Sequence, residues 1–82
     1  MTPEICKAAR ALTSMTQKEL ALTAGIATPT IADFERGARK PHGNNLKSVI
    51  IAFENNGLSF VEEDGEIVGI LFNKKNNLPL RP

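Results

Sequence analysis

Residues 16–37 carry start and stop signals for two short helices joined by a very short connection. Thr16-Gln17-Lys18-Glu19 has the pattern of a capping box, in which the first side chain accepts the last N–H and the last side chain accepts the first N–H. Gly25 is suited to end that helix in the left-handed conformation. Thr28-Pro29 then opens a second helix, which Gly37 ends. The sequence therefore predicts two helices held at a fixed angle by a tight turn.

Further helices are expected before and after this pair. Thr2, with Pro3 at the first helical position, begins a helix over the first dozen residues. Its expected apolar stripe consists of Ile5, Ala8, Ala9 and Leu12. Asn44 or Asn45 is expected to cap a fourth helix that ends near Gly57. The inward face of this helix is expected to consist of Leu46, Val49, Ile50 and Phe53.

The pattern changes after Gly57. Two runs rich in β-branched and aromatic residues, 58–61 and 67–72, flank an acidic stretch that contains Asp64-Gly65. Asp-Gly between such runs predicts a β-hairpin, either with a two-residue turn or with Gly65 as the bulge of a three-residue loop. The expected fold is mainly α: a helical domain that contains the two closely joined helices, followed by a C-terminal β-hairpin. It divides into a helical part (1–57), the hairpin (58–72) and a flexible tail (73–82).

Length and composition limit the functions that remain. Eighty-two residues form one small domain. Cys6 is the only cysteine, which rules out an intramolecular disulfide and a Cys-rich zinc site and favours a cytoplasmic location. No apolar run approaches the roughly 20 residues of a membrane span. Because no nucleophile, paired-carboxylate or metal-ligand pattern is present, we expect no enzyme, cofactor, metal or membrane partner.

Charge is distributed unevenly along the chain. The formal net charge is only +1, low for a nucleic-acid-binding domain. Residues 1–48 contain seven basic and four acidic residues, for a net charge of +3, whereas residues 49–82 contain three basic and five acidic residues, for a net charge of −2. The positive excess thus coincides with the paired helices.

The paired helices resemble those of the XRE, or Cro/lambda-repressor-like, helix-turn-helix family over roughly residues 5–57. The matching pattern is Thr16-Gln17-Lys18-Glu19-Leu20-Ala21-(x)3-Gly25-Ile26-Ala27-(x)3-Ile31-(x)2-Phe34-Glu35-(x)-Gly37. This resemblance implies a four- or five-helix fold that binds double-stranded DNA as a dimer, without catalysis. The chain departs from the family in two respects: a hairpin replaces a terminal helix, and Ala27 stands where many relatives have a capping Ser or Thr.

The resemblance also implies which side chains meet DNA. The reading face of the second paired helix comprises Thr28, Pro29, Ala32, Asp33 and Arg36. The methyl groups of Thr28 and Ala32 suit thymine methyls, and Asp33 can accept from a cytosine amino group. The expected phosphate contacts are Gln17, Thr30, Arg36, Arg39 and Lys40. A structural ion pair between Arg10 and Glu35, common in the family, is implied as well.

The hairpin is the expected dimer interface. Strict alternation places Ile67 and Leu71 on one face of the second strand, and Val68, Ile70 and Phe72 on the other. The helices can cover only one apolar face, and two strands leave two open edges. We therefore expect a homodimer through residues 58–72.

Three functions remain open at this point. The first is a sequence-specific, repressor-type transcriptional regulator. The second is the antitoxin of a toxin–antitoxin pair, in which the hairpin or the tail (73–82) holds a toxin and DNA binding is autoregulatory. The third is a scaffold that has lost DNA binding, a reading favoured by the low net charge.

Overall fold

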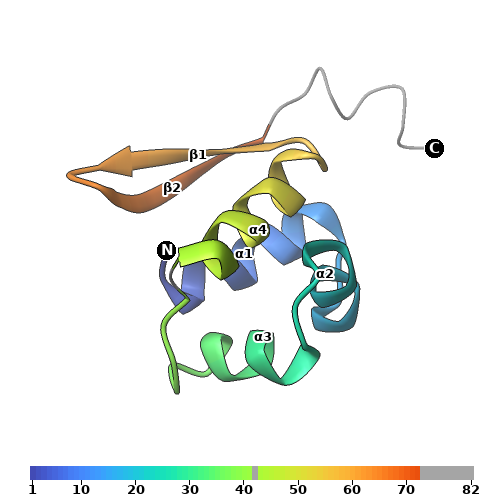
Figure 1. Cartoon of the computed structure of the whole chain (residues 1–82). Helices are drawn as coiled ribbons and strands as arrows, with labels where there is room; N and C mark the ends of the chain where they lie inside the picture. Colours follow the sequence, from blue (N-terminus) through green and yellow to red (C-terminus); the bar gives the residue numbers. More distant parts are fainter. Residues whose placement is uncertain (42, 73–82) are drawn as a thin grey trace.

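The computed structural model describes residues 1–41 and 43–72; the predicted flexible tail, 73–82, lies outside the described residues. Within them, the chain forms four helices and one hairpin (Figure 1). In chain order these elements are α1 (Pro3–Thr13), α2 (Gln17–Ala24), α3 (Thr28–Glu35), α4 (Gly43–Glu54), β1 (Leu58–Glu63) and β2 (Glu66–Phe72). The expected mainly helical class with a C-terminal hairpin is confirmed. No helix in the described part of the chain is long and apolar enough to cross a bilayer.

The predicted helix starts form through side-chain caps. The Thr2 hydroxyl accepts the Ile5 N–H at 3.1 Å. At the start of α2 both halves of the capping box are present, because Thr16 Oγ1 accepts the Glu19 N–H at 3.0 Å and Glu19 Oε1 accepts the Thr16 N–H at 2.8 Å. Gly25, with φ of +72°, ends α2 in the left-handed conformation. These local signals set where α2 begins and ends.

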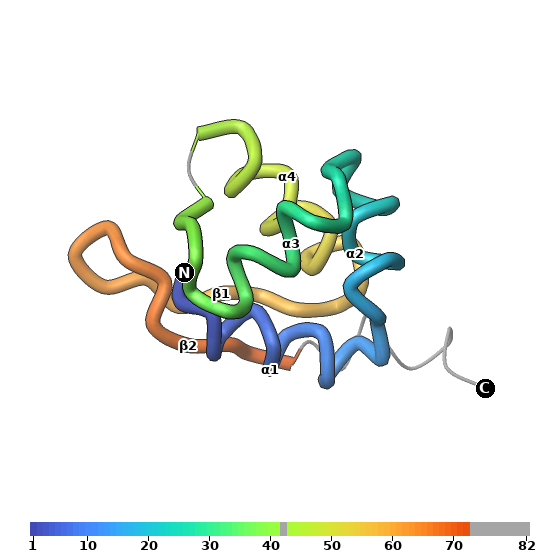
Figure 2. Tube along the Cα trace, turned by 90° about the horizontal axis from the view of Figure 1, so that it is seen from below, coloured from blue at the N-terminus to red at the C-terminus, as the bar shows by residue number. Residues whose placement is uncertain are grey.

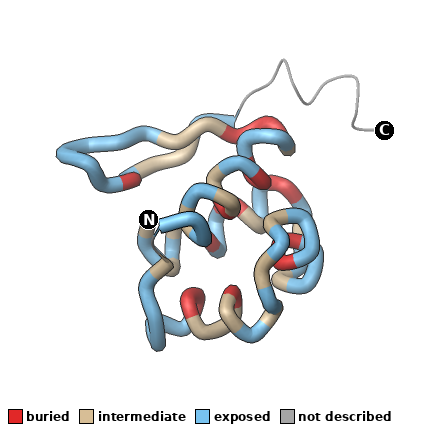
Figure 3. Tube along the Cα trace, in the orientation of Figure 1, coloured by how far each residue is buried: buried red, intermediate tan, exposed pale blue. Residues whose placement is uncertain are grey.

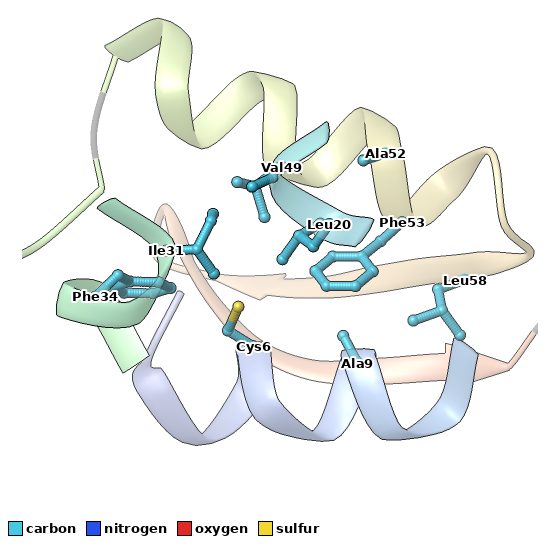
Figure 4. Close-up of a cluster of buried hydrophobic side chains, with 10 residues drawn as sticks. Cys6, Ala9, Leu20, Ile31, Phe34, Val49, Ala52, Phe53 and Leu58 are labelled. Atoms are coloured by element: carbon cyan, nitrogen blue, oxygen red, sulfur yellow. The ribbon is translucent and has the colours of Figure 1, made fainter. Parts of the chain in front are cut away.

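One buried cluster joins the helices to the hairpin. Side chains of α1 point toward those of α4, with Leu20 and Ile31 between them (Figure 4). The cluster consists of Cys6, Ala9, Leu20, Ala21, Ile31, Phe34, Val49, Ala52, Phe53 and Leu58. Phe53 of α4 and Phe60 of β1 meet edge to face, with ring centroids 6.0 Å apart. The base of the hairpin therefore belongs to the same core as the helices.

The apolar stripe expected on α1 is confirmed only in part, because Ala9 is buried and Ile5 is half-buried but its other two members are exposed. The buried side chains of α1 are Cys6, Ala9 and Thr13, whereas Ala8 and Leu12 are exposed. Thr13 is tolerated in the interior because its hydroxyl donates to the Ala9 carbonyl oxygen at 2.8 Å. Hydrophobic periodicity alone predicts that a polar residue such as Thr13 is exposed, because it takes no account of this hydrogen bond.

The start and the inward face of α4 also differ from expectation. The helix begins at Gly43, so Asn44 and Asn45 lie in its first turn and do not cap it from outside. Its buried residues are Val49, Ala52 and Phe53, whereas the expected Leu46 and Ile50 are only half-buried. Ala52 is 1% exposed and belongs to the buried cluster, so the inward face of α4 includes a residue that the expected set left out.

Asp64 and Gly65 form a two-residue turn, which settles the alternative that the sequence left open. Both residues have positive φ, +53° and +79°, and Glu63 pairs directly with Glu66. This is the geometry of a type I′ hairpin, in which two left-handed residues match the twist of the strands.

A bulge changes the faces of β2. Val61 pairs with Gly69 and Glu62 pairs with Ile67, so Val68 is an extra residue in β2. Strict alternation across the strand is therefore wrong. Ile67 is only 5% exposed and Ile70 packs against the buried cluster, so both face the helices, although alternation placed them on opposite faces.

The hairpin and α3 lie on opposite sides of the molecule. The hairpin covers α1 and α4, while α3 lies beyond these helices (Figures 1 and 2). The outer part of the hairpin, around its turn, is exposed (Figure 3). Near the turn of the hairpin the two parts approach each other, because Glu62 and Glu66 line one hollow together with Arg39 and Lys40 of the loop after α3.

Candidate nucleic-acid interface

The pair α2 and α3 is joined by a tight turn, Gly25-Ile26-Ala27. The Ile26 N–H donates to the Ala21 carbonyl oxygen at 2.9 Å, which holds the turn against the end of α2. On α3, Ile31, Phe34 and Glu35 are buried and lie on one side of the helix, as their i, i+3 and i+4 spacing requires. Burial of this side fixes the rotation of α3 about its axis and leaves the opposite side outward.

The outward side of α3 carries the predicted reading face. Its members are Thr28, Pro29, Ala32, Asp33 and Arg36, all exposed or half-buried. Thr30 does not share this side. It lines a separate hollow beside α3, together with Arg39 and Lys40 from the following loop. Thr30, Arg39 and Lys40 therefore lie beside the reading face, whereas Arg36 belongs to the face itself.

Asp33 binds two of the predicted phosphate-binding cations. Its Oδ1 lies 2.7 Å from Arg36 Nη2, and its Oδ2 lies 3.6 Å from Arg39 Nη2. Sequence reasoning assigned these three residues separate contacts with DNA and missed their association. The i, i+3 spacing of Asp33 and Arg36 was the available signal, whereas Arg39 lies beyond the end of α3 and its position depends on the loop.

Arg10 and Glu35 form the ion pair that the resemblance implied. Arg10 Nε donates to Glu35 Oε2 at 2.7 Å, and Arg10 Nη2 donates to Glu35 Oε1 at 2.8 Å. Arg10 Nη1 also donates to the Met15 carbonyl oxygen at 3.0 Å. This fork joins α1 to α3 and to the segment before α2, so it orients the reading helix.

Hydrogen bonds keep Glu35 ionised despite its burial. Burial alone would raise the pKa of Glu35, but hydrogen bonds from Arg10, Gln17 and Cys6 together hold the pKa below its ordinary value. Burial, followed by the hydrogen bond to Glu35 and its charge, raises the pKa of the Cys6 thiol. Cys6 therefore remains a protonated donor, 3.2 Å from Glu35 Oε2, and is unreactive as a nucleophile.

Gln17 stands at the first position of α2 and contacts the same carboxylate. Its Nε2 donates to Glu35 Oε1 at 3.0 Å, so its amide is oriented by the ion pair. Gln17 also borders a shallow groove of about 380 Å³, which the reading-face residues Ala32 and Arg36 share. Lys7 of α1 lines this groove too, a cation that the sequence reasoning missed although its i, i+3 spacing from Arg10 was visible.

The described part of the chain contains no cluster of His, Cys, Asp and Glu side chains suited to hold a metal ion. The acidic side chains that do meet other groups near α3 are paired with arginines. The chemistry of this surface is therefore that of cations, hydroxyls and methyl groups arranged around one helix.

Comparison with known protein families gives a direct match. The profile of a family described as Helix-turn-helix matches residues 7–56, more than half of the chain. No curated protein gave a significant match. Members of the family are DNA-binding regulators and not typically enzymes. The matched residues include α2, the tight turn, α3 and the Arg10–Glu35 pair between α1 and α3, and the chain belongs to the XRE/lambda-repressor-like helix-turn-helix family.

Proposed function

We propose that the protein is a sequence-specific, repressor-type transcriptional regulator of the cytoplasm that places α3 in the major groove of double-stranded DNA. The observation that carries this proposal is the orientation of α3. Ile31, Phe34 and Glu35 fix its inner side in the core, and the outward side presents side chains of the kind that contact base edges. Thr28 and Ala32 offer methyl groups to thymine, and Pro29 packs beside them.

Phosphate contacts on both sides of α3 position it in the groove. Gln17, at the N-terminus of α2, offers its amide and the free N–H groups of the first turn to one phosphate. Arg36 contacts the backbone on the same side as Gln17, whereas Thr30, Arg39 and Lys40 contact it on the other side of the reading face. All three cations are exposed and precede α4 in a short loop.

Replacing Arg36, Arg39 or Lys40 by Ala is expected to weaken binding to all duplexes nearly equally. Each lost phosphate contact lowers the slope of log K against log salt by about one, because fewer counterions are released. Fluorescence anisotropy with a labelled random-sequence duplex at several salt concentrations measures the slope. Lys47→Ala, which removes an exposed cation of α4 outside this set, is the control. Unchanged slopes in all three variants would show that another surface meets DNA.

The proposed regulator acts as a homodimer through the hairpin. Val61, Val68 and Leu71 form an exposed apolar outer face, which the helices do not cover. Two copies can meet through this outer face or through a strand edge. Pairing through the outer face would turn the two α3 helices in opposite directions, because α3 lies on the far side of the molecule (Figure 1). Pairing through an edge keeps both α3 helices on one side, where one duplex can reach them.

The edge of β2 is the better seam. β1 ends in Glu62-Glu63, and a β1 seam would set these charges against the apolar start of the partner's β1. β2 continues from Ile67 to Phe72 without a charged residue. The molecule measures 36 × 30 × 19 Å. Two copies placed side by side along one of the two longer dimensions would hold their α3 helices at a distance comparable to one helical turn of DNA, roughly 34 Å.

The exposed outer face also favours a second function. In an edge-paired dimer Val61, Val68 and Leu71 remain uncovered, and an apolar patch of this kind suits a protein partner. An antitoxin would use it to hold a toxin while α3 binds DNA for autoregulation. Co-expression with the product of the neighbouring reading frame tests this alternative. A stoichiometric complex lost in Val61→Lys supports it, and separate elution of the two proteins contradicts it.

A further inference from the structure

The carboxylate of Asp33 has the surroundings that a DNA phosphate would require. One oxygen contacts Arg36 and the other faces Arg39, at 2.7 and 3.6 Å. A backbone phosphate likewise offers two oxygens that share one negative charge, and paired guanidinium groups are a common way of binding it. Both arginine side chains are more than half exposed, so they can also turn toward solvent or DNA.

We propose that Asp33 acts as an internal substitute for a DNA phosphate and thereby lowers binding to every sequence. The inference rests on the proposed function, because it assumes that α3 and the following loop meet DNA. A phosphate that takes Arg36 and Arg39 must displace the carboxylate or share the two cations with it. Asp33 then remains close to the phosphate as a like charge, which opposes binding.

This penalty raises specificity. Every duplex has phosphates at the same places, so the cost falls equally on all sequences. A site that presents an amino group, such as cytosine N4, can donate to the displaced Asp33 carboxylate and recover part of the cost. Sites without that donor cannot. Asp33 is therefore a specificity-determining residue that acts mainly by weakening non-specific binding, in keeping with the low net charge of the chain.

The variant Asp33→Asn removes the charge and keeps the shape of the side chain. It is expected to bind a labelled random-sequence duplex about three- to tenfold more tightly than the wild type, a range set by a partly exposed charge. The slope of log K against log salt should steepen by about one. Glu54→Gln makes the same charge change at the exposed end of α4 and should give a much smaller gain. Asp33→Ala should behave like Asp33→Asn.

Combining Asp33→Asn with the loss of both arginines tests whether its gain in DNA binding depends on these two cations. In a background that carries Arg36→Ala and Arg39→Ala, Asp33→Asn should lose most of its gain, because the two cations it competes for are gone. Unchanged or weaker binding by Asp33→Asn, or a gain equal to that of Glu54→Gln, overturns the inference while the proposed function stands. A wild-type protein that binds no duplex even at low salt overturns both. Circular dichroism of each variant verifies that the fold is kept.

Discussion

Replacing Arg10 by Met is expected to lower the free energy of unfolding by about 3 kcal/mol. Glu35 is only 3% exposed and receives both ends of the Arg10 fork, at 2.7 and 2.8 Å. Without Arg10, an ionised carboxylate stays buried with the weaker donors Gln17 and Cys6 as its remaining partners. The partial exposure of the Arg10 side chain puts the loss at the lower end of the range for buried pairs.

Urea denaturation followed by circular dichroism measures this loss. Arg36→Met is the matched control, since the Arg36 pair with Asp33 is exposed and should contribute about 0.5 kcal/mol or less. Arg10→Met combined with Glu35→Leu should recover most of the stability, because no unpaired charge is then buried. A change within about 0.5 kcal/mol for Arg10→Met alone would show that the pair does not hold α1 against α3.

Replacing Leu71 by Lys is expected to convert a dimer into a folded monomer with much weaker operator binding. Leu71 is 60% exposed on the outer face of β2, so a lysine there does not disturb the core. In the proposed β2 seam, antiparallel pairing about the middle of the strand sets Leu71 beside the apolar stretch of the partner's β2, so the substitution replaces an apolar cross-strand contact by a charge. Loss of the second half-site contact should reduce affinity for a two-half-site operator about a hundredfold or more.

Sedimentation at micromolar concentration measures the oligomeric state, and anisotropy measures operator affinity. Leu22→Lys places the same charge on the 82% exposed Leu22 of α2, away from the hairpin, and should stay dimeric. Ile70 is unsuitable for this test, because the bulge turns it toward the helices. A monomeric wild type, or a Leu71→Lys protein that remains dimeric, would rule out the hairpin seam.

Elements set by local chemistry were the most predictable from sequence. The capping box from Thr16 to Glu19 depends on neighbouring residues and forms as predicted. The hairpin predicted from Asp64-Gly65 also forms, with the two-residue turn that was one of the two alternatives. The face of α1 was partly mispredicted because a local hydrogen bond lets Thr13 enter the core. The faces of β2 were mispredicted because alternation carries no mark of the bulge at Val68, apart from the adjacent Gly69.

In the candidate site, too, features set by neighbouring residues were predictable and contacts between separate elements were not. Helical spacing was enough to separate the buried side of α3 from its outward side. The family resemblance supplied the pair of Arg10 with Glu35. Contacts that depend on how separate elements pack could not be deduced from spacing. They are the Gln17 hydrogen bond to Glu35 and the approach of Arg39 to Asp33.

Selection of bound duplexes from a random DNA pool tests sequence-specific binding by α3 most directly. The wild-type protein is mixed with the pool at moderate salt, bound duplexes are recovered through several rounds, and the enriched sequences are read. The account predicts a two-fold symmetric site with half-site centres about 10 base pairs apart, since two α3 helices on one side of a dimer reach successive major grooves. A variant lacking Arg36, Arg39 and Lys40 should enrich nothing. A wild-type pool that stays random through all rounds would contradict the account.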